Sequence, residues 1–229
     1  MIDWSGVETV LCDMDGTLLD LRFDNHFWQE HLPRHYATCF EMPLADARDE
    51  LARRFRAAEG TLHWYCVDHW SRELGLDIAA LKAEVSHMIA WRPGAQDLLT
   101  ALRALGKRLV LVTNAHMKTM TLKFACTNLD RYFDAVVCAH DLGCPKEDRE
   151  FWARFARLER FTPHATLLID DSLPVLRSAK AYGIAYTLAI RQPDSGGAIK
   201  DCGEFSGVSS FDEILPREFP GGNAVPDTA

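Results

Sequence analysis

Five short and mostly apolar runs, each followed by a polar residue, constrain the fold of this chain more than any other feature. The runs cover residues 7–12, 108–112, 135–139, 166–169 and 185–190. Helical patterns lie between the later runs, and the one at residues 95–105 starts just after Pro93 and stops before Gly106. Nearly continuous apolar strands are typical of a sheet that helices cover on both faces. Strands alternating with helices therefore predict a doubly wound α/β fold with a parallel, Rossmann-like sheet.

Residues 20–92 interrupt this alternation. Apolar residues such as Leu44, Ala47 and Leu51 recur there at helical spacing, and no convincing strand pattern is present. We therefore expect a catalytic core of residues 1–19 and 93–215, an inserted all-helical cap of residues 20–92, and a flexible tail of residues 216–229. Because the insertion follows the first strand, the cap should lie over the carboxyl ends of the strands, where open α/β sheets bind ligands.

Composition argues against two classes of partner. The formal net charge of −8 disfavours nucleic-acid binding, which depends on clustered lysine and arginine side chains. No run approaches the roughly 20 apolar residues of a membrane span, and the N-terminus lacks a signal-peptide pattern. Seven cysteines without a C-x-x-C pair fit reduced thiols. We expect a cytoplasmic protein that binds neither nucleic acid nor membrane, and its oligomeric state stays open.

Polar residues capable of phosphate chemistry gather at the ends of the expected strands. These residues are Asp13, Asp15, Thr113, Asn114, Lys146, Asp170 and Asp171. The carboxyl ends of parallel strands meet in one crevice, so residues far apart in sequence can lie together there. Carboxylates a few ångströms apart repel one another by about 4 kcal/mol at an effective dielectric near 20, unless a cation compensates them. Oxygen donors alone favour a hard cation, and Mg²⁺ fits best.

Each of these residues alone has an ordinary structural explanation. Asp15-Gly16 could be a turn, Asp170-Asp171 could cap a helix, and Lys146 could be a solvated surface lysine. A calcium loop is excluded because its glycine would stand sixth, whereas Gly16 is the fourth residue from Asp13. The full string D-x-D-G-T would arise by chance in roughly one chain of this length in a thousand. The combination therefore favours a functional site.

Four segments in this order resemble the four motifs of the haloacid dehalogenase-like hydrolases. They are DMDGT at residues 13–17, LVTN at 111–114, PK at 145–146 and LIDDS at 168–172. Residues 20–92 resemble the first type of helical cap in that superfamily. The resemblance implies a magnesium-dependent phosphatase that acts on a small phosphomonoester.

The resemblance also implies a role for each site residue. Asp13 would be the nucleophile and Asp15 the general acid and base. Mg²⁺ would be held by Asp13, by the backbone carbonyl of Asp15 and by Asp170, with Asp171 supporting a metal-bound water. Thr113, Asn114 and Lys146 would bind the phosphate.

Further segments resemble bacterial nucleotidases of this superfamily that act on GMP and IMP. They are residues 18–21, 23–25, 27–29, 61–62, 64–66, 74–78, 113–116, 145–148 and 193–196. Several of them lie in the expected cap, where the choice of substrate should be made. The resemblance therefore implies hydrolysis of purine nucleoside 5′-monophosphates to nucleoside and phosphate.

Other readings of the same residues remain open. The substrate could be a sugar phosphate or another small phosphomonoester. A phosphomutase would retain all four motifs, whereas a dehalogenase would have no need of Asp15 as an acid. A binding protein would use the acidic cluster only to hold metal.

Cap aromatic and histidine residues have less specific explanations. The aromatic residues are Phe23, Phe27, Trp28, Trp64, Tyr65 and Trp70, and for each of them packing within the cap is the more common role. The cap histidines are His26, His31, His35, His63, His69 and His87. They are expected to be packed or surface residues without a metal-binding spacing.

Overall fold

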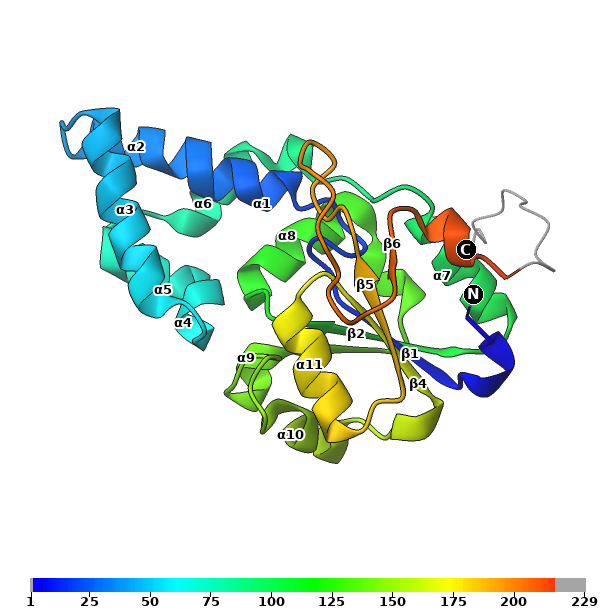
Figure 1. The fold of residues 1–229 in the computed structure, drawn as a ribbon. Helices are drawn as coiled ribbons and strands as arrows, with labels where there is room; N and C mark the ends of the chain where they lie inside the picture. The colour runs from blue at the N-terminus through cyan, green and yellow to red at the C-terminus, as the bar shows by residue number, and fades with distance from the viewer. Residues whose placement is uncertain (1, 217–229) are drawn as a thin grey trace.

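A six-stranded parallel sheet forms the centre of the protein (Figure 1). This computed structural model describes residues 2–216, so residues 217–229 of the expected tail lie outside the described part. The strands are β1 (Thr9–Cys12), β2 (Arg108–Thr113), β3 (Ala135–Cys138), β4 (Thr166–Asp170), β5 (Tyr186–Ile190) and β6 (Gly207–Val208), and their order is β3-β2-β1-β4-β5-β6. The predicted fold class is confirmed. The sequence prediction missed β6, because two residues are too few to show a period.

Alternate residues of each strand face two different apolar clusters. Leu109 and Leu111 of β2 point toward α7 (Ala95–Ala104) and α8 (Met117–Thr127), whereas Val110 and Val112 point toward the opposite face. That second face is covered by α10 (Phe151–Leu158) and α11 (Leu173–Tyr182). Helices therefore cover both faces of the sheet, which accounts for the nearly continuous apolar strands. Short turns of helix complete the core: α9 (Ala139–Leu142) and the 3-10 helices at Trp4–Gly6, Leu129–Tyr132, Pro163–Ala165 and Phe211–Ile214.

A group of helices inserted after β1 stands beyond one end of the sheet (Figure 1). Its elements are α1 (Arg22–His26), a π-helix (Phe27–His31), α2 (Leu32–Cys39), α3 (Leu44–Ala58), α4 (Leu62–Tyr65), α5 (Val67–Leu74), α6 (Ile78–Glu84) and a 3-10 helix (Ser86–Met88). They enclose an apolar cluster of their own around Phe27, Leu51 and Trp70. This separate cluster supports the division into cap and core, which stays a prediction.

Two neighbouring linkers connect the helical insertion to the sheet. Leu19 pairs with Trp91, the Asp20 N–H donates to the Ala90 carbonyl (2.9 Å), and the Arg92 N–H donates to the Leu18 carbonyl (2.9 Å). The buried guanidinium of Arg92 donates to the carbonyl of Ser209 (3.0 Å) and to that of Gln192. The chain thus leaves and re-enters the core at one anchored point.

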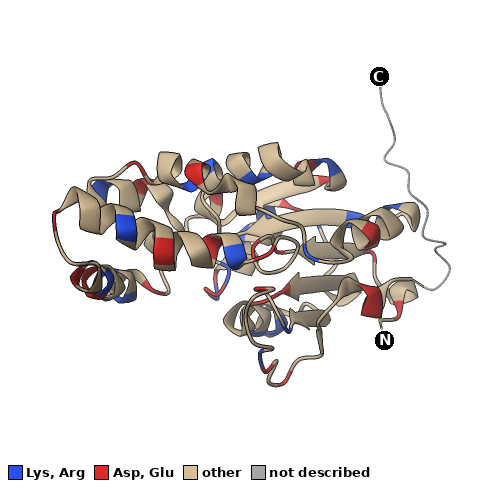
Figure 2. Cartoon of the chain, turned by 90° about the horizontal axis from the view of Figure 1, so that it is seen from above, with Lys and Arg blue, Asp and Glu red and all other residues tan. Residues whose placement is uncertain are grey.

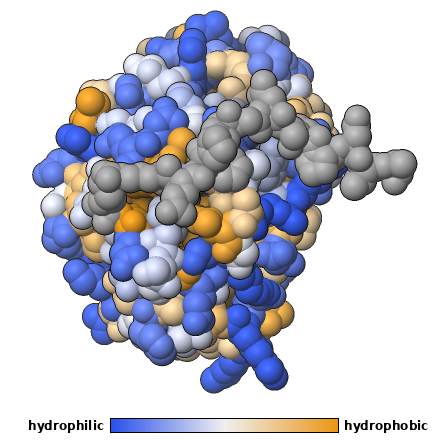
Figure 3. Space-filling view, turned by 90° about the vertical axis from the view of Figure 1, so that its right-hand side faces the viewer, coloured by the Kyte–Doolittle hydropathy of each residue, from blue (hydrophilic) through white to orange (hydrophobic). Residues whose placement is uncertain are grey.

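The surface carries charges of both signs. Figure 2 shows lysine and arginine interspersed with aspartate and glutamate along the helices of the cap and the core. Figure 3 views the end of the core away from the cap and shows apolar residues in small groups among hydrophilic ones. Within residues 2–216, no helix combines the length and the apolar character needed to cross a membrane.

Truncation of Leu51 tests whether the cap unfolds as a unit of its own. Leu51 is buried in the cap cluster, and removing such a side chain costs about 2–5 kcal/mol. We expect Leu51→Ala to raise amide hydrogen exchange, measured by mass spectrometry, in residues 22–88 while the strands stay protected. The matched control is Leu98→Ala in α7, which should raise exchange in the sheet. Equal increases in both regions for each variant would contradict the division.

Candidate active site

The buried ammonium group of Lys146 joins the two central acidic residues of the site. Asp13 directly follows β1 and Asp170 ends β4, the strand beside it. The Lys146 Nζ donates to Asp13 Oδ1 (2.5 Å), to Asp170 Oδ2 (2.7 Å) and to the Val112 carbonyl (3.1 Å). Lys146 is only 2% exposed. The lysine is therefore a built part of the site, and its alternative as a solvated surface residue is excluded.

Backbone hydrogen bonds hold the loop that carries Lys146. Its N–H donates to Asn114 Oδ1 (2.9 Å), and its carbonyl accepts from the Ser178 hydroxyl (2.7 Å). The Asp13 N–H donates to the Ile169 carbonyl (3.0 Å), which continues the pairing of β1 with β4. The acidic residues and the lysine are thus positioned by the edge of the sheet and by α11.

Burial raises the pKa of all three carboxyl groups in this cluster, and the positive charge of Lys146 offsets the effect only in part. It raises the pKa of Asp13 to about 6, because Lys146 only partly offsets the loss of water and Asp170 adds repulsion. Burial also raises the pKa of Asp170, and together with Asp13 and Asp170 it raises the pKa of Asp171 well above its ordinary value. Burial acts oppositely on Lys146, but the carboxylates of Asp13 and Asp170 outweigh it and raise the pKa of that ammonium. Asp13 and Asp170 therefore share one buried lysine, and the Asp171 carboxyl group stands close to both.

The acidic cluster fits a hard divalent cation. Carboxylate oxygens of Asp13, Asp170 and Asp171 all lie within 4.8 Å of one another. Asp13 Oδ2 is buried and has no hydrogen-bond partner within residues 2–216. An added cation would satisfy this oxygen and relieve the repulsion, and an all-oxygen donor set suits Mg²⁺.

Gly16 allows the turn after Asp15 to approach Asp171. Its φ of +82° is strained for residues with a Cβ, and a Cβ there would stand 2.8 Å from the Asp171 carboxyl group. The glycine of the D-x-D-G-T string is therefore required by the geometry of the acidic cluster itself.

Asp15 faces a different set of charges. Its Oδ1 accepts from Lys123 Nζ (2.5 Å), the same Nζ donates to Asp24 Oδ2 (2.5 Å), and Lys82 Nζ donates to Asp24 Oδ1 (2.7 Å). Lys123 belongs to α8 of the core, whereas Asp24 and Lys82 belong to α1 and α6. A continuous chain of ion pairs thus runs from Asp15 into the helical insertion.

Burial and the charges of Lys123 and Lys82 together determine the pKa values of Asp15 and Asp24. Burial raises the pKa of Asp15 to about 6, although the Lys123 charge opposes the shift. For Asp24 burial would act in the same direction, but Lys123 and Lys82 outweigh it and hold the pKa of that carboxyl below its usual range. Burial lowers the pKa of Lys82, whereas Asp15 and Asp24 outweigh burial at Lys123 and raise its pKa.

Sequence analysis missed Lys123, Lys82 and Asp24 as parts of the site. Each is a single charged residue in a helical stretch, and nothing in the local pattern marks it as buried. Asp24 lies in one of the segments that resemble nucleotidases, and that was the signal available in the sequence.

The phosphate-binding candidates lie where the prediction put them. Thr113 ends β2 and is buried, and its Oγ1 accepts from the Ala115 N–H (3.0 Å). Asn114 donates through Nδ2 to Glu147 Oε2 (3.0 Å), and Glu147 Oε1 accepts from the Tyr65 hydroxyl (3.1 Å). The structure therefore brings all seven predicted site residues to one cavity, while their catalytic roles stay predictions.

Comparisons with known proteins identify the family. The family profile of the haloacid dehalogenase-like hydrolases matches residues 7–183. The chain belongs to this family. Its similarity to the GMP/IMP nucleotidase YrfG of Escherichia coli is 38% identity, covering 94% of this hydrolase and 97% of the relative. The expected phosphomonoester hydrolase is thereby confirmed.

Two other relatives broaden this comparison. A phosphoglycolate phosphatase of Nitrosospira multiformis is 43% identical over 77% of this hydrolase and 80% of its own chain. The crystal structure of a HAD phosphatase from Thermococcus onnurineus superimposes with a TM-score of 0.73 at 22% identity, covering 91% of this chain and 96% of the other. That structural match supports the fold alone.

Aromatic residues of the cap divide into two groups. Phe23, Phe27 and Trp70 are buried in the apolar cluster of the cap. Trp28, Trp64 and Tyr65 line a cavity of about 350 Å³ that also touches the core residues of the site. A cavity of this size is within the range for small-molecule sites. Packing within the cap is therefore correct for the first group, whereas the second group is available to a substrate.

Replacing Lys123 tests whether its buried ion pairs stabilise the protein more than an ion pair at the surface does. The side chain is 2% exposed, and removing one partner of a buried ion pair costs about 3–5 kcal/mol. We expect Lys123→Gln to lose this amount of unfolding free energy in urea titrations, because Asp15 and Asp24 would then face each other. Lys118→Gln on the same helix is the control, since Lys118 pairs with Asp68 at the surface. Equal stability of the two variants would refute the role given to Lys123.

Proposed function

We propose that this hydrolase cleaves purine nucleoside 5′-monophosphates such as GMP and IMP to a nucleoside and inorganic phosphate. The observation that carries the proposal is the 38% identity to a GMP/IMP nucleotidase over 94% of the chain, which includes the cap. The aromatic wall formed by Trp28, Trp64 and Tyr65 supports it, because a flat apolar base gains from such surfaces.

Asp13 is proposed as the nucleophile. One of its carboxylate oxygens attacks the phosphorus atom, the bond from phosphorus to the 5′ oxygen breaks, and an aspartyl-phosphate forms. Lys146 holds Oδ1 at 2.5 Å, so the unpartnered Oδ2 is the oxygen left for attack or for metal binding. Water then hydrolyses the aspartyl-phosphate and restores the carboxylate.

Asp15 is proposed as the general acid and base. A carboxylic acid whose pKa lies near 6 keeps a useful protonated fraction close to neutral pH. It gives its proton to the departing 5′ oxygen, and the resulting carboxylate takes a proton from the attacking water in the second step. Lys123 favours the carboxylate form and holds its orientation.

Mg²⁺ would be held by Asp13, the backbone carbonyl of Asp15 and Asp170, with Asp171 in support. When bound, it supplies positive charge that screens the anionic nucleophile from the anionic phosphate. Lys146 contributes a fixed positive charge beside Asp13 Oδ1. Thr113 and the backbone N–H of Asn114 bind the phosphate oxygens.

A second substrate class has support of its own. The relative from Nitrosospira multiformis is named a phosphoglycolate phosphatase, and a small phosphomonoester would use the same residues at the phosphorus atom. The two proposals differ in the cap, because only a nucleotide has a base to place against Trp28 and Trp64.

Phosphate release from a substrate panel tests the proposal. The panel contains GMP, IMP, pyrimidine nucleotides, sugar phosphates and 2-phosphoglycolate, each with Mg²⁺ and with EDTA. We expect the highest kcat/KM for GMP and IMP, with no release in EDTA. Asp13→Asn should abolish turnover, whereas Asp46→Asn, a change at an exposed residue of α3, should leave it intact. Full activity of Asp13→Asn would refute the mechanism, and a preference for 2-phosphoglycolate would refute only the substrate class.

Truncation of Trp64 tests the aromatic wall separately. The side chain lines the cavity, and the residue is 37% exposed. Loss of a stacking partner costs about 1–3 kcal/mol, so kcat/KM for GMP should fall about 5- to 150-fold in Trp64→Ala. The rate with ribose 5-phosphate, which keeps the sugar and the phosphate but has no base, should change little. Phe40→Ala, at an exposed aromatic residue outside the cavity, is the control. A parallel loss with both substrates would argue against base stacking.

A further inference from the structure

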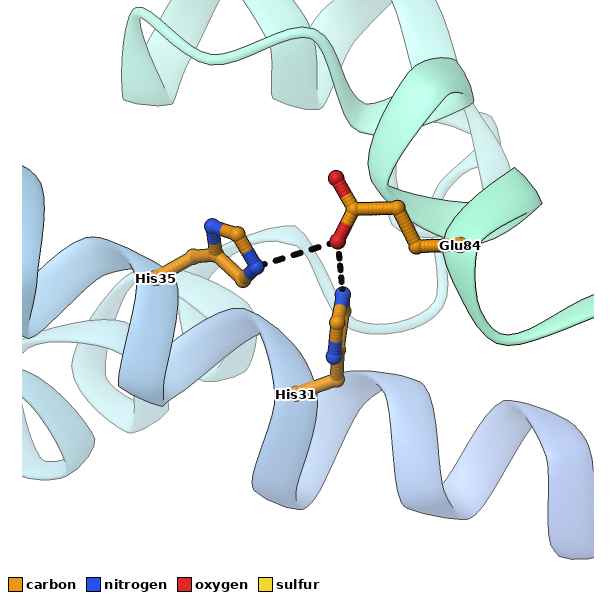
Figure 4. A group of neighbouring side chains, drawn as sticks. All are labelled: His31, His35 and Glu84. Carbon is orange, nitrogen blue, oxygen red and sulfur yellow. Dashed lines mark hydrogen bonds and ion pairs between the residues drawn. The ribbon is translucent and has the colours of Figure 1, made fainter.

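Two histidines and a glutamate converge on the outer side of the cap. His31 ends the π-helix, His35 lies one turn later in α2, and Glu84 ends α6 (Figure 4). The distances from Glu84 Oε2 are 3.0 Å to His31 Nε2 and 3.1 Å to His35 Nε2. All three ligand atoms lie within 4.8 Å of one another. None of these residues lines the cavity of the candidate active site.

We propose that His31, His35 and Glu84 form a second metal site, which binds a borderline transition-metal cation of the Zn²⁺ class. Zinc bonds to nitrogen and oxygen are about 2.0–2.2 Å long, so neighbouring ligands of a tetrahedral ion stand about 3.3 Å apart. The two distances to Glu84 are close to that value. Little rearrangement would be needed to admit the ion.

The donor set separates this site from the acidic cluster. Two imidazole nitrogens and one carboxylate oxygen suit zinc, nickel or copper, whereas the three carboxylates beside Lys146 suit magnesium. His31 is partly buried, and its Nε2 lies 3.0 Å from Glu84 Oε2. A neutral imidazole keeps the lone pair that a metal needs.

The helix that carries both histidines has an irregular turn at this place. Residues Phe27–His31 form a π-helix immediately before α2, and Pro33 stands in the first turn of α2. Pro33 has no N–H to give to the Gln29 carbonyl, and its ring crowds that carbonyl, which favours the wider turn. Turns of this kind are frequent at functional sites. Here the turn directs His31 and His35 toward α6 (Figure 4).

A metal at this position would join two elements that also hold the ion pairs of the active site. Asp24 lies in α1, at the start of the same run of helix as His31, and Lys82 lies two residues before Glu84 in α6. Exposure of Glu84 leaves the fourth coordination position open to water. The site is therefore suited to stabilise the cap from outside, with no part in the reaction.

Zinc titration of the intact protein tests the proposal. Zn²⁺ is added in competition with a chromophoric chelator, with excess Mg²⁺ present to occupy the acidic cluster. Wild type should bind one Zn²⁺, and the affinity should fall more than about 100-fold in both His35→Gln and Glu84→Gln. Mutation of residues that only hydrogen-bond to metal ligands already lowers affinity by up to that factor. Zn²⁺ at 100 times its Kd should raise the wild-type Tm by about 5–10 °C.

The matched control removes two other cap histidines. The imidazole rings of His63 and His69 stack with their centroids 4.4 Å apart. Neither residue belongs to a metal-ligand group within residues 2–216. His63→Gln/His69→Gln should bind zinc as wild type does, and the cysteines are the same in all four proteins. The proposal fails if wild type binds no zinc in the presence of Mg²⁺, or if all four proteins bind it equally. Glu84 is exposed, His35 is half-buried, and neither belongs to the apolar cluster of the cap. Their substitution therefore leaves the core of the cap intact, and loss of folding would not imitate loss of the site.

Discussion

The buried ammonium of Lys146 is the interaction on which the rest of the site depends. It lies between Asp13 and Asp170, and it is 133 residues from the first of them. Two carboxylates this deeply buried would be strongly destabilising if the charge between them were removed. The strand order brings these distant residues together, because β1 lies between β2 and β4 and the carboxyl ends of these parallel strands meet at one edge of the sheet. Even so, Asp13 Oδ2 has no partner in the described chain, and this makes the cluster receptive to a cation.

Lys123 is a second buried lysine between two carboxylates, and it connects the core to the cap. One side of its ammonium meets Asp15 and the other meets Asp24, which is itself paired with Lys82. Asp15, the proposed general acid and base, is therefore held by a lysine that also contacts the cap. Displacement of the cap would leave Lys123 and Asp15 with an altered set of charges, so the position of the cap and the protonation of Asp15 are physically linked.

The cap keeps its packed aromatic residues apart from those that line the cavity. Phe27 and Trp70 fill its interior, whereas Trp28 and Trp64 face the cavity. Helix α6 shows the same separation over three residues, because Lys82 turns inward to Asp24 and Glu84 turns outward to His31 and His35. A small helical unit therefore combines an aromatic cavity wall, an ion-pair network and a histidine cluster.

The sequence by itself determined the doubly wound sheet and the members of the acidic cluster. Both rest on local signals: apolar runs that end in polar residues, and a D-x-D-G-T string whose glycine is needed at φ +82°. Only the tertiary structure decided that Lys123 and Lys82 are buried and that β6 adds a last strand to the sheet. It also decided which aromatic residues of the cap reach the cavity, and that His31 and His35 lie beside Glu84. The physical reason is that a lone lysine, tryptophan or histidine in a helix looks the same whether it is packed or solvated. Its environment is set by elements far away in the chain, and no local period records them.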